Sequence, residues 1–404
     1  MNDWVYTKNE FSETIKKFEK SIGLLQKYVE LDFLRVKNEI VSIKELSEII
    51  NLTFYRAYNI EMQEEWSLDS KEGCRGFLAE MEKMVSIWKE SIARRSGSKV
   101  ERDFWDLYEW FQYVDVDSIY SLVLHNFKEL PLEIQREYIR LPERYSFLNG
   151  KIDIEAQDFS LIKEYVVMMK SHIDDYKWLF EHLADYRSKV ILNGIVNYWF
   201  RFDIDELHNM VETVYSDYYD LDITGLTDTN TVLVDLGAYT GDSVYEFINI
   251  YGRYKKIYAY ELTPSTYQNL VNNTIDMENV VCVQKGVGRE CALININDNE
   301  NDAGNKISNA GNTQVEITTI DSDITEEIGI IKMDIEGAEK DALIGAQGHI
   351  TKEKPQLLIS AYHIPADIFD IPRIIHQFRD DYQFYLRFNG HGCLWPCDYV
   401  ILAV

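Results

Sequence analysis

The sequence predicts an all-α helical region followed by an α/β domain that is built on a parallel sheet. Residues 1–225 carry apolar residues at helical spacing and contain only two prolines, Pro131 and Pro142. In the rest of the chain, short apolar runs rich in Val and Ile alternate with amphipathic runs, which is the pattern of strands covered by helices. The polar segment 226–231 separates the two patterns, so we predict domains at 1–225 and 226–404.

Length and charge limit the class of protein. A chain of 404 residues is longer than a single hydrophobic core usually supports. Its 46% of hydrophobic residues suffice to pack two cores. The formal net charge of −27 predicts an acidic surface that repels nucleic-acid phosphates and anionic lipid headgroups. We therefore expect no nucleic-acid binding and no membrane insertion, and no apolar run is long enough to span a bilayer. Five widely spaced cysteines, and a start without the pattern of a secretory leader, favour a cytoplasmic location.

An apolar stripe runs through the first part of the helical region, from Ile15 to Ile50, at spacings that mostly alternate between three and four. It predicts a long helix that either packs within the region's own bundle or joins two copies into a homodimer. Gly23 and Asp32 interrupt the stripe, which favours the bundle. Further helical segments are predicted at Phe77–Ile92, Phe104–Phe127, Glu164–Tyr186, Ile191–Phe202 and Leu207–Tyr219.

The second region alternates strands and helices in a regular order. Parallel strands are predicted at Val232–Val234, Lys256–Glu261, Val280–Lys285, Ile328–Asp334 and Gln356–Ala361. Two pairs of runs have the pattern of antiparallel strands, namely Ala292–Ile296 with Gln314–Thr319 and Tyr382–Phe388 with Asp398–Val404. The second of these pairs is expected to be a hairpin appended to the sheet.

A glycine turn follows the first strand. The apolar run ends abruptly at Asp235, and Gly237 and Gly241 follow before an amphipathic helix begins. Glycines lack a Cβ atom, so a ligand can approach the backbone at the carboxyl end of the strand. The spacing Asp-x-Gly-x-x-x-Gly differs from the Gly-x-Gly-x-x-Gly that seats a dinucleotide pyrophosphate. An S-adenosylmethionine-type ligand therefore fits better, and a nicotinamide oxidoreductase is disfavoured.

Four motifs in this region together resemble one known family. They are Val234–Asp242, Ile331–Glu339, the pair Tyr362 and His363, and a closing hairpin with Tyr-Leu-Arg and Trp-Pro. This combination is similar to the FkbM-type family of S-adenosylmethionine-dependent methyltransferases over roughly the last 180 residues, the size of one domain. The resemblance implies a Rossmann-like seven-stranded methyltransferase sheet whose last strand is antiparallel. It also implies methyl transfer to a hydroxyl oxygen of a sugar, a polysaccharide or a natural product.

Candidate cofactor-binding residues lie at the ends of the first two strands. Glu261 follows the second strand, about 25 residues after Asp235, where a carboxylate can accept hydrogen bonds from both ribose hydroxyls of a nucleotide-type ligand. The alternative for Glu261 is a surface acid at a strand end. The predicted cofactor-binding residues are Asp235, Gly237, Ala238, Tyr239, Gly241, Asp242, Glu261 and Leu262.

Candidate catalytic residues lie at the ends of the fourth and fifth strands. Asp334 and Glu336 follow the fourth strand, and His363 follows the fifth. An alcohol is a weak nucleophile, so a base should take its proton, and His363 or Asp334 is the expected acceptor. The alternative for His363 is a buried histidine that bonds to a neighbouring loop. Oxygen and imidazole ligands suit a divalent metal, but the spacing is not a metal signature and we predict no metal.

The residues and the resemblance together predict an S-adenosylmethionine-dependent O-methyltransferase with a small-molecule or saccharide acceptor. The helical region would orient the enzyme, dimerise it or supply part of the acceptor site. A rival interpretation is a catalytically silent S-adenosylmethionine-binding protein whose helical region docks a protein partner. Fold alone does not fix a substrate, so the acceptor has no sequence-based assignment.

Overall fold

The structure, a computed structural model, describes residues 97–404 except 142–144, 146, 149, 203–207, 216–217, 297–312 and 391–394. The chain divides into two compact units, Met1–Val114 and Asp115–Val404. The predicted stripe from Ile15 to Ile50, and with it the predicted homodimer contact, lies outside the described residues, as does Phe77–Ile92. Helices and sheet thus share the second unit, and a domain boundary between residues 225 and 226 stays a prediction.

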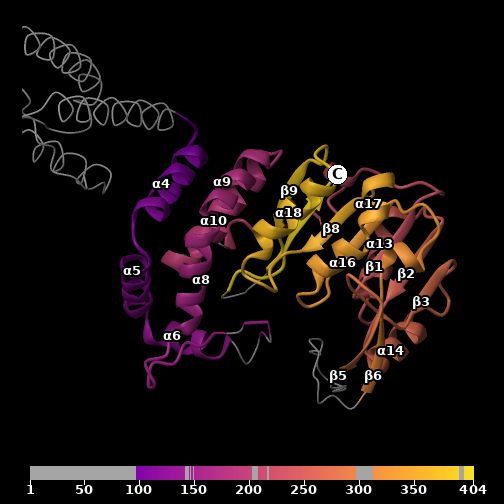
Figure 1. Ribbon diagram of the computed structural model, residues 1–404, viewed down its shortest axis with the longest axis horizontal. Helices are drawn as coiled ribbons and strands as arrows, with labels where there is room; N and C mark the ends of the chain where they lie inside the picture. The colour runs from indigo at the N-terminus through magenta and orange to yellow at the C-terminus, as the bar shows by residue number, and fades with distance from the viewer. Residues whose placement is uncertain are drawn as a thin grey trace, which may run out of the picture. The chain divides into compact units, whose positions relative to one another are not determined.

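A seven-stranded sheet forms the centre of the second unit, in the order β3-β2-β1-β7-β8-β10-β9 (Figure 1). Its strands are β1 (Val232–Leu236), β2 (Lys256–Tyr260), β3 (Val280–Val283), β7 (Ile330–Met333), β8 (Gln356–Ser360), β9 (Phe384–Phe388) and β10 (Tyr399–Ala403). The first five of these strands are parallel, and β10 runs antiparallel to β8 and β9 on either side of it. This arrangement confirms the predicted α/β fold and the antiparallel last strand.

The order of the strands reverses at β1. The chain moves from β1 to β2 on one side, and β7 pairs with β1 on the other side. Ligands of open α/β sheets bind outside the carboxyl ends of the strands at such a reversal. Every residue of β1 and of β7 is buried, as expected for parallel strands that are covered on both faces. The site is therefore expected where these two strands end.

Helices lie before the sheet in sequence and between its strands. The helices of residues 97–225 are α4 (Lys99–Tyr113), α5 (Val116–Glu129), α6 (Leu132–Ile139), α8 (Ser160–Ser171), α9 (Ile173–His182), α10 (Tyr186–Arg201) and α12 (Leu221–Thr224). Those between the strands are α13 (Asp242–Tyr251), α14 (Pro264–Thr274), α15 (Ile320–Asp323), α16 (Glu339–Gly345), α17 (Gln347–Glu353) and α18 (Asp367–Phe378). Among the residues that the structure describes, no helix combines the length and the apolar character needed to cross a bilayer.

One apolar cluster joins α13 to the sheet. Val244 and Phe247 of α13 pack with Leu233 of β1 and Ile257 of β2, and all four are fully buried. Tyr219, which precedes α12, belongs to the same cluster. The apolar residues of α13 therefore face the sheet, as the amphipathic run after the glycine turn predicts.

A second, three-stranded sheet has the order β4-β6-β5. Its strands are β4 (Gly286–Val287), β5 (Ala292–Ile296) and β6 (Thr313–Thr318). β5 and β6 are antiparallel, and Ile294 lies opposite Val315. The predicted antiparallel pair is confirmed, and β4 adds a short parallel partner that the sequence analysis did not identify.

The single helical run predicted at Phe104–Phe127 is wrong. α4 ends at Tyr113, and α5 begins at Val116 after a break. Asp115 causes the new start, because its side chain accepts a hydrogen bond from the backbone N–H of Ser118 and so caps α5.

The helix predicted at Leu207–Tyr219 is also wrong, since its described residues contain no helix beyond His208. The side chain of Glu212 folds back onto the chain, and its Oε1 atom accepts hydrogen bonds from the backbone N–H groups of Thr213, Val214 and Tyr215. Such local bonds compete with the helical pattern. The backbone N–H of Glu212 also donates to the carbonyl oxygen of Phe388 at 2.6 Å, which places the segment along β9.

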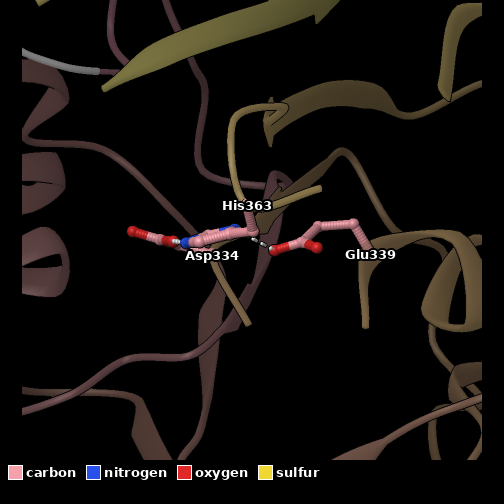
Figure 2. A group of neighbouring side chains, drawn as sticks. All are labelled: Asp334, Glu339 and His363. Carbon is pink, nitrogen blue, oxygen red and sulfur yellow. Dashed lines mark ion pairs between the residues drawn. The ribbon is translucent and has the colours of Figure 1, made fainter. Parts of the chain in front are cut away.

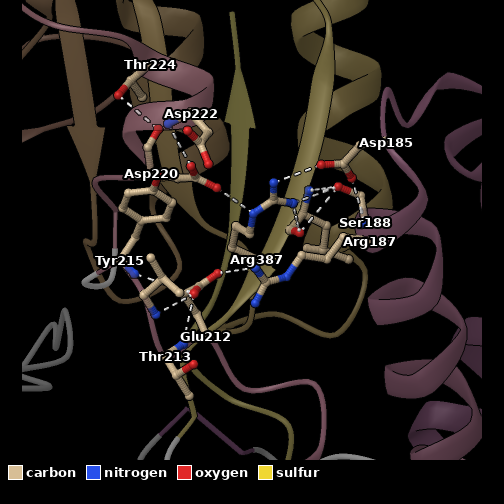
Figure 3. Close-up of polar contacts among 12 residues, drawn as sticks. Asp185, Arg187, Ser188, Glu212, Thr213, Tyr215, Asp220, Asp222, Thr224 and Arg387 are labelled. Atoms are coloured by element: carbon tan, nitrogen blue, oxygen red, sulfur yellow. Dashed lines mark hydrogen bonds and ion pairs between the residues drawn. The ribbon is translucent and has the colours of Figure 1, made fainter.

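A buried guanidinium joins two helix starts to the edge strand (Figure 3). Arg387 of β9 donates to Asp220 at 2.7 Å and to Asp185 at 2.8 Å. Asp220 caps α12 and Asp185 caps α10. Ser188, in the first turn of α10, accepts a third hydrogen bond from Arg387 at 3.1 Å. One side chain thus connects the helices to the sheet.

Replacing this guanidinium tests its contribution to stability. Arg387→Met should lower the free energy of unfolding by about 3–5 kcal/mol, because it leaves the buried carboxylate of Asp220 and the partly exposed one of Asp185 without a counter-ion. Urea denaturation of the full chain measures the loss. Arg379→Met is the matched control, since its partner Asp381 is 48% exposed, and it should have a much smaller effect. Equal losses in both variants would contradict the assignment.

Candidate active site

The turn after β1 is packed against the loop after β7. Gly237 has a φ angle of 79°, and a Cβ atom there would lie 1.8 Å from the carbonyl oxygen of Asp334. The backbone N–H of Asp334 in turn donates to the carbonyl oxygen of Leu236 at 2.9 Å. Only glycine permits this approach, so Gly237 brings the two loops together at the reversal of strand order.

Asp235 stabilises this turn through contacts with Lys332 and Ser243. Its carboxylate is fully buried, lies 3.1 Å from the ammonium of Lys332 and accepts a hydrogen bond from Ser243 at 2.6 Å. Lys332 also donates to the carbonyl oxygen of Gly237 at 2.9 Å. The structure therefore places Asp235 in the scaffold of the turn, and any contact between Asp235 and a cofactor stays a prediction.

Glu261 connects the ends of β1 and β2. One carboxylate oxygen accepts a hydrogen bond from the backbone N–H of Thr263 at 2.8 Å, and the other accepts one from Tyr239 at 3.2 Å. Burial raises the pKa of Glu261 above its usual range, although these two bonds oppose the rise. Two backbone donors thus fix the direction of a carboxylate that also lines a pocket.

A pocket of about 640 Å³ lies at the carboxyl ends of the central strands. That volume lies within the range for cofactor and small-molecule sites. Six predicted site residues line it, namely Gly237, Glu261, Leu262, Asp334, Glu336 and His363. The other five are not among its lining residues, namely Asp235, Ala238, Tyr239, Gly241 and Asp242. The structure thus brings the candidate catalytic residues and Glu261 to one cavity.

His363 lies among the carboxylates of Asp334, Glu336 and Glu339, and Figure 2 shows it between Asp334 and Glu339. Its side chain is 1% exposed, and its Nε2 atom lies 3.3 Å from Oδ1 of Asp334 and 3.9 Å from Oε2 of Glu336. On the opposite side of the ring, Nδ1 lies 3.0 Å from Oε1 of Glu339, which is fully buried. Tyr218, which precedes α12, donates to the Oδ2 atom of Asp334 at 2.7 Å.

The carboxylates change the acidity of His363. Burial by itself lowers its pKa, but Glu339, Asp334 and Glu336 outweigh burial and raise the pKa to about 9. For Asp334, burial raises the pKa, yet the charges of His363 and Lys332 bring it below the usual range. Near neutral pH the resting site therefore holds an imidazolium beside an ionised Asp334.

Asp334, Glu339 and His363 also offer three atoms within 4.8 Å of one another, which is close enough for metal coordination. In the metal-free protein these contacts are ion pairs. The expectation that the site holds no metal stays a prediction.

The sequence analysis missed several residues that belong to the site, among them Phe147 and Lys332. The Phe147 ring, from the chain between α6 and α8, lines the pocket and lies 5.7 Å from the His363 ring and 5.4 Å from that of Tyr362. No sequence pattern marks it. Lys332 was detectable, since a lysine within the apolar run of β7 requires a buried partner.

The fold and pocket define an α/β domain of the methyltransferase type. Residues 235–385 match the family model described as "Methyltransferase FkbM domain". The chain therefore contains an FkbM methyltransferase domain, which confirms the predicted resemblance. A comparison with curated proteins gave no match.

The chain is also similar to solved structures. Methyltransferase FkbM from Methylobacillus flagellatus matches with a TM-score of 0.51 and 25% identity over 60% of this chain. The chain spans 62% of the length of that protein. An rRNA methylase from Streptococcus thermophilus matches with a TM-score of 0.31 and 14% identity, over 45% of this chain and 89% of that one. Aeropyrum pernix fibrillarin, in complex with S-adenosyl-L-methionine, matches with a TM-score of 0.29 and 13% identity. The match covers 44% of this chain and 67% of that one.

The raised pKa of His363 predicts a pH-dependent contribution to stability. A group whose pKa is higher in the folded protein stabilises it fully below the unfolded value, 6.5, and loses this effect as the pH rises through about 9. The difference in free energy of unfolding between the wild type and His363→Gln should therefore shrink across this range. Urea denaturation at several pH values measures it. A difference that stays constant with pH would exclude the raised pKa.

Proposed function

We propose that the protein is an S-adenosylmethionine-dependent O-methyltransferase that acts on a hydroxyl of a sugar, a polysaccharide or a natural product. The observation that carries the proposal is one pocket that contains both the oriented carboxylate of Glu261 and the pair of His363 and Asp334. The FkbM methyltransferase domain supports it, since its match spans the strands that build this pocket.

The residues at one end of the pocket fit the nucleoside part of such a cofactor. Each oxygen of Glu261 accepts one backbone hydrogen bond, and the carboxylate also bonds to the side chain of Thr263. Its remaining lone pairs could accept from ribose hydroxyls. Gly237 and Leu262 line the same pocket. When bound, the cofactor would supply a methyl group on a sulfonium, and Glu261 with its neighbours would hold it against the turn after β1.

The residues at the other end fit the acceptor. Methyl transfer is an in-line displacement, so the protein has to position the two reactants and remove a proton. In the proposed mechanism Nε2 of His363 accepts this proton once the imidazole is neutral. Asp334 and Glu336, beside that nitrogen, would accept hydrogen bonds from acceptor hydroxyls.

The helical region contributes to the acceptor end. Phe147 lines the pocket beside His363, and an aromatic ring offers an apolar surface to a sugar or a natural product. The net charge of −27 favours such acceptors over nucleic acid. In this proposal the enzyme is cytoplasmic, and the helices between residues 115 and 224 help to shape its acceptor site.

Cofactor binding provides the first test. Calorimetric titration with S-adenosylmethionine and S-adenosylhomocysteine should give micromolar affinity, and Glu261→Ala should weaken it at least about tenfold, or about 1.4 kcal/mol. Glu181→Ala is the control, because this glutamate is 50% exposed and pairs with Lys177 on α9. No binding of either ligand to the wild type would overturn the proposal and favour a helical region that docks a protein partner.

The pH dependence of turnover tests the base. With the acceptor found by screening sugars and natural-product alcohols, kcat/KM should rise with pH and level off above about 9, because His363 must lose its proton before it can accept another. Transfer of a radiolabelled methyl group measures the rate. A profile that is flat from about pH 7 to about 10 would exclude His363 as the base.

A further inference from the structure

Glu339 is a fully buried carboxylate at the start of α16, behind His363 as seen from the pocket. Its Oε1 atom accepts a hydrogen bond from the backbone N–H of Ile335 at 2.9 Å and lies 3.0 Å from Nδ1 of His363 (Figure 2). The first contact closes the loop between β7 and α16. The second connects this loop to a side chain at the end of β8, far along the chain.

We propose that Glu339 is the positioning residue for His363, holding the proton on Nδ1 so that Nε2 faces Asp334 and the pocket. This inference rests on the proposed function. A histidine ring has two nitrogens, and the partner of one decides which nitrogen is left for chemistry. Here the buried carboxylate lies at Nδ1, and the pocket-lining carboxylates of Asp334 and Glu336 lie near Nε2.

The three carboxylates around the ring differ in exposure. Asp334 and Glu336, which follow β7, have side chains that are 28% and 38% exposed, whereas Glu339 on α16 is fully buried. Water screens the first two and leaves Glu339 with the strongest interaction. Glu339 is accordingly the largest of the influences that raise the pKa of His363. Neither Oε2 of Glu339 nor Nδ1 of His363 makes a hydrogen bond to the described residues. The contact of Oε1 with Nδ1 at 3.0 Å is therefore an ion pair, and the imidazole is the partner of Glu339 beyond Ile335.

The geometry gives each group one part in the reaction. Nε2 of neutral His363 takes the proton that the acceptor oxygen loses as that oxygen bonds to the methyl carbon. The sulfur keeps the electron pair of the broken carbon–sulfur bond, so the sulfonium becomes a neutral thioether. Glu339, on the Nδ1 side of the ring, stabilises the imidazolium that forms. Asp334, held on its far side by the hydroxyl of Tyr218, completes a chain of contacts across the site.

A purely structural role for Glu339 makes a different prediction. If it only closed the loop through Ile335, its replacement would reduce stability but would leave the acidity of His363 unchanged. The protein contains a second histidine–glutamate pair for comparison, His349 with Glu353, at 2.7 Å and with both side chains largely buried. His349 is not among the residues that line the pocket.

Nuclear magnetic resonance titration of labelled histidine rings provides the test, with the His363 signal assigned from its absence in His363→Gln. Wild-type His363 should titrate well above its ordinary pKa, and Glu339→Gln should lower that pKa by at least about one unit, a tenfold change in proton affinity. Glu353→Gln should leave the His363 signal unchanged. Glu339→Asp, which keeps the charge, should retain part of the shift.

An unchanged His363 pKa in Glu339→Gln, or an equal decrease in Glu353→Gln, would overturn the proposal. Calorimetric binding of S-adenosylhomocysteine verifies that each variant keeps its fold, and Glu339→Asp carries the test if Glu339→Gln does not fold. The proposed function fails separately, through loss of cofactor binding in the wild type. In that case the titration of the His363 ring still decides whether Glu339 keeps the proton on Nδ1.

Discussion

The contact between the loops that follow β1 and β7 is the constraint on which the site depends. The two loops meet at Gly237, which leaves no space for a side chain against the carbonyl oxygen of Asp334. The buried side chain of Lys332 stabilises this contact. Its ammonium donates a hydrogen bond to the carbonyl oxygen of Gly237 and forms an ion pair with Asp235. Because the backbone of Asp334 is fixed in this way, its carboxylate is delivered to the edge of the pocket beside His363.

Charged groups are buried at two further places, and burial has different consequences at each. Arg387 satisfies two carboxylates that cap helices, so its charge connects the helices to the edge of the sheet. His363 is surrounded by more negative charge than it can neutralise, so its own proton affinity rises. A buried charge must be paired, but a guanidinium keeps its proton, whereas the imidazole of His363 can release its proton as the pH approaches about 9. The cluster around Arg387 therefore stabilises the fold, and the cluster around His363 can take part in proton transfer.

Segments between the helices of residues 115–224 contribute directly to the candidate site. Tyr218 donates a hydrogen bond to Asp334, and Phe147 packs against His363 at the pocket wall. These contacts explain how a helical region and a methyltransferase domain can share one compact unit. They also indicate that variation in these segments, and not only in the loops of the sheet, would change the shape of the pocket.

The sequence by itself determined the local elements, namely the strands, the glycine turn and the two acidic strand ends, because these follow from short-range patterns of apolar residues and glycine. It did not identify α18, whose apolar residues have helical spacing but include Pro372. Only the tertiary structure decided that Asp235 lies beneath the turn, that Phe147 reaches the pocket and that Glu339 lies behind His363. Each of these depends on packing between segments that are distant in the chain, and such packing leaves no local pattern in the sequence.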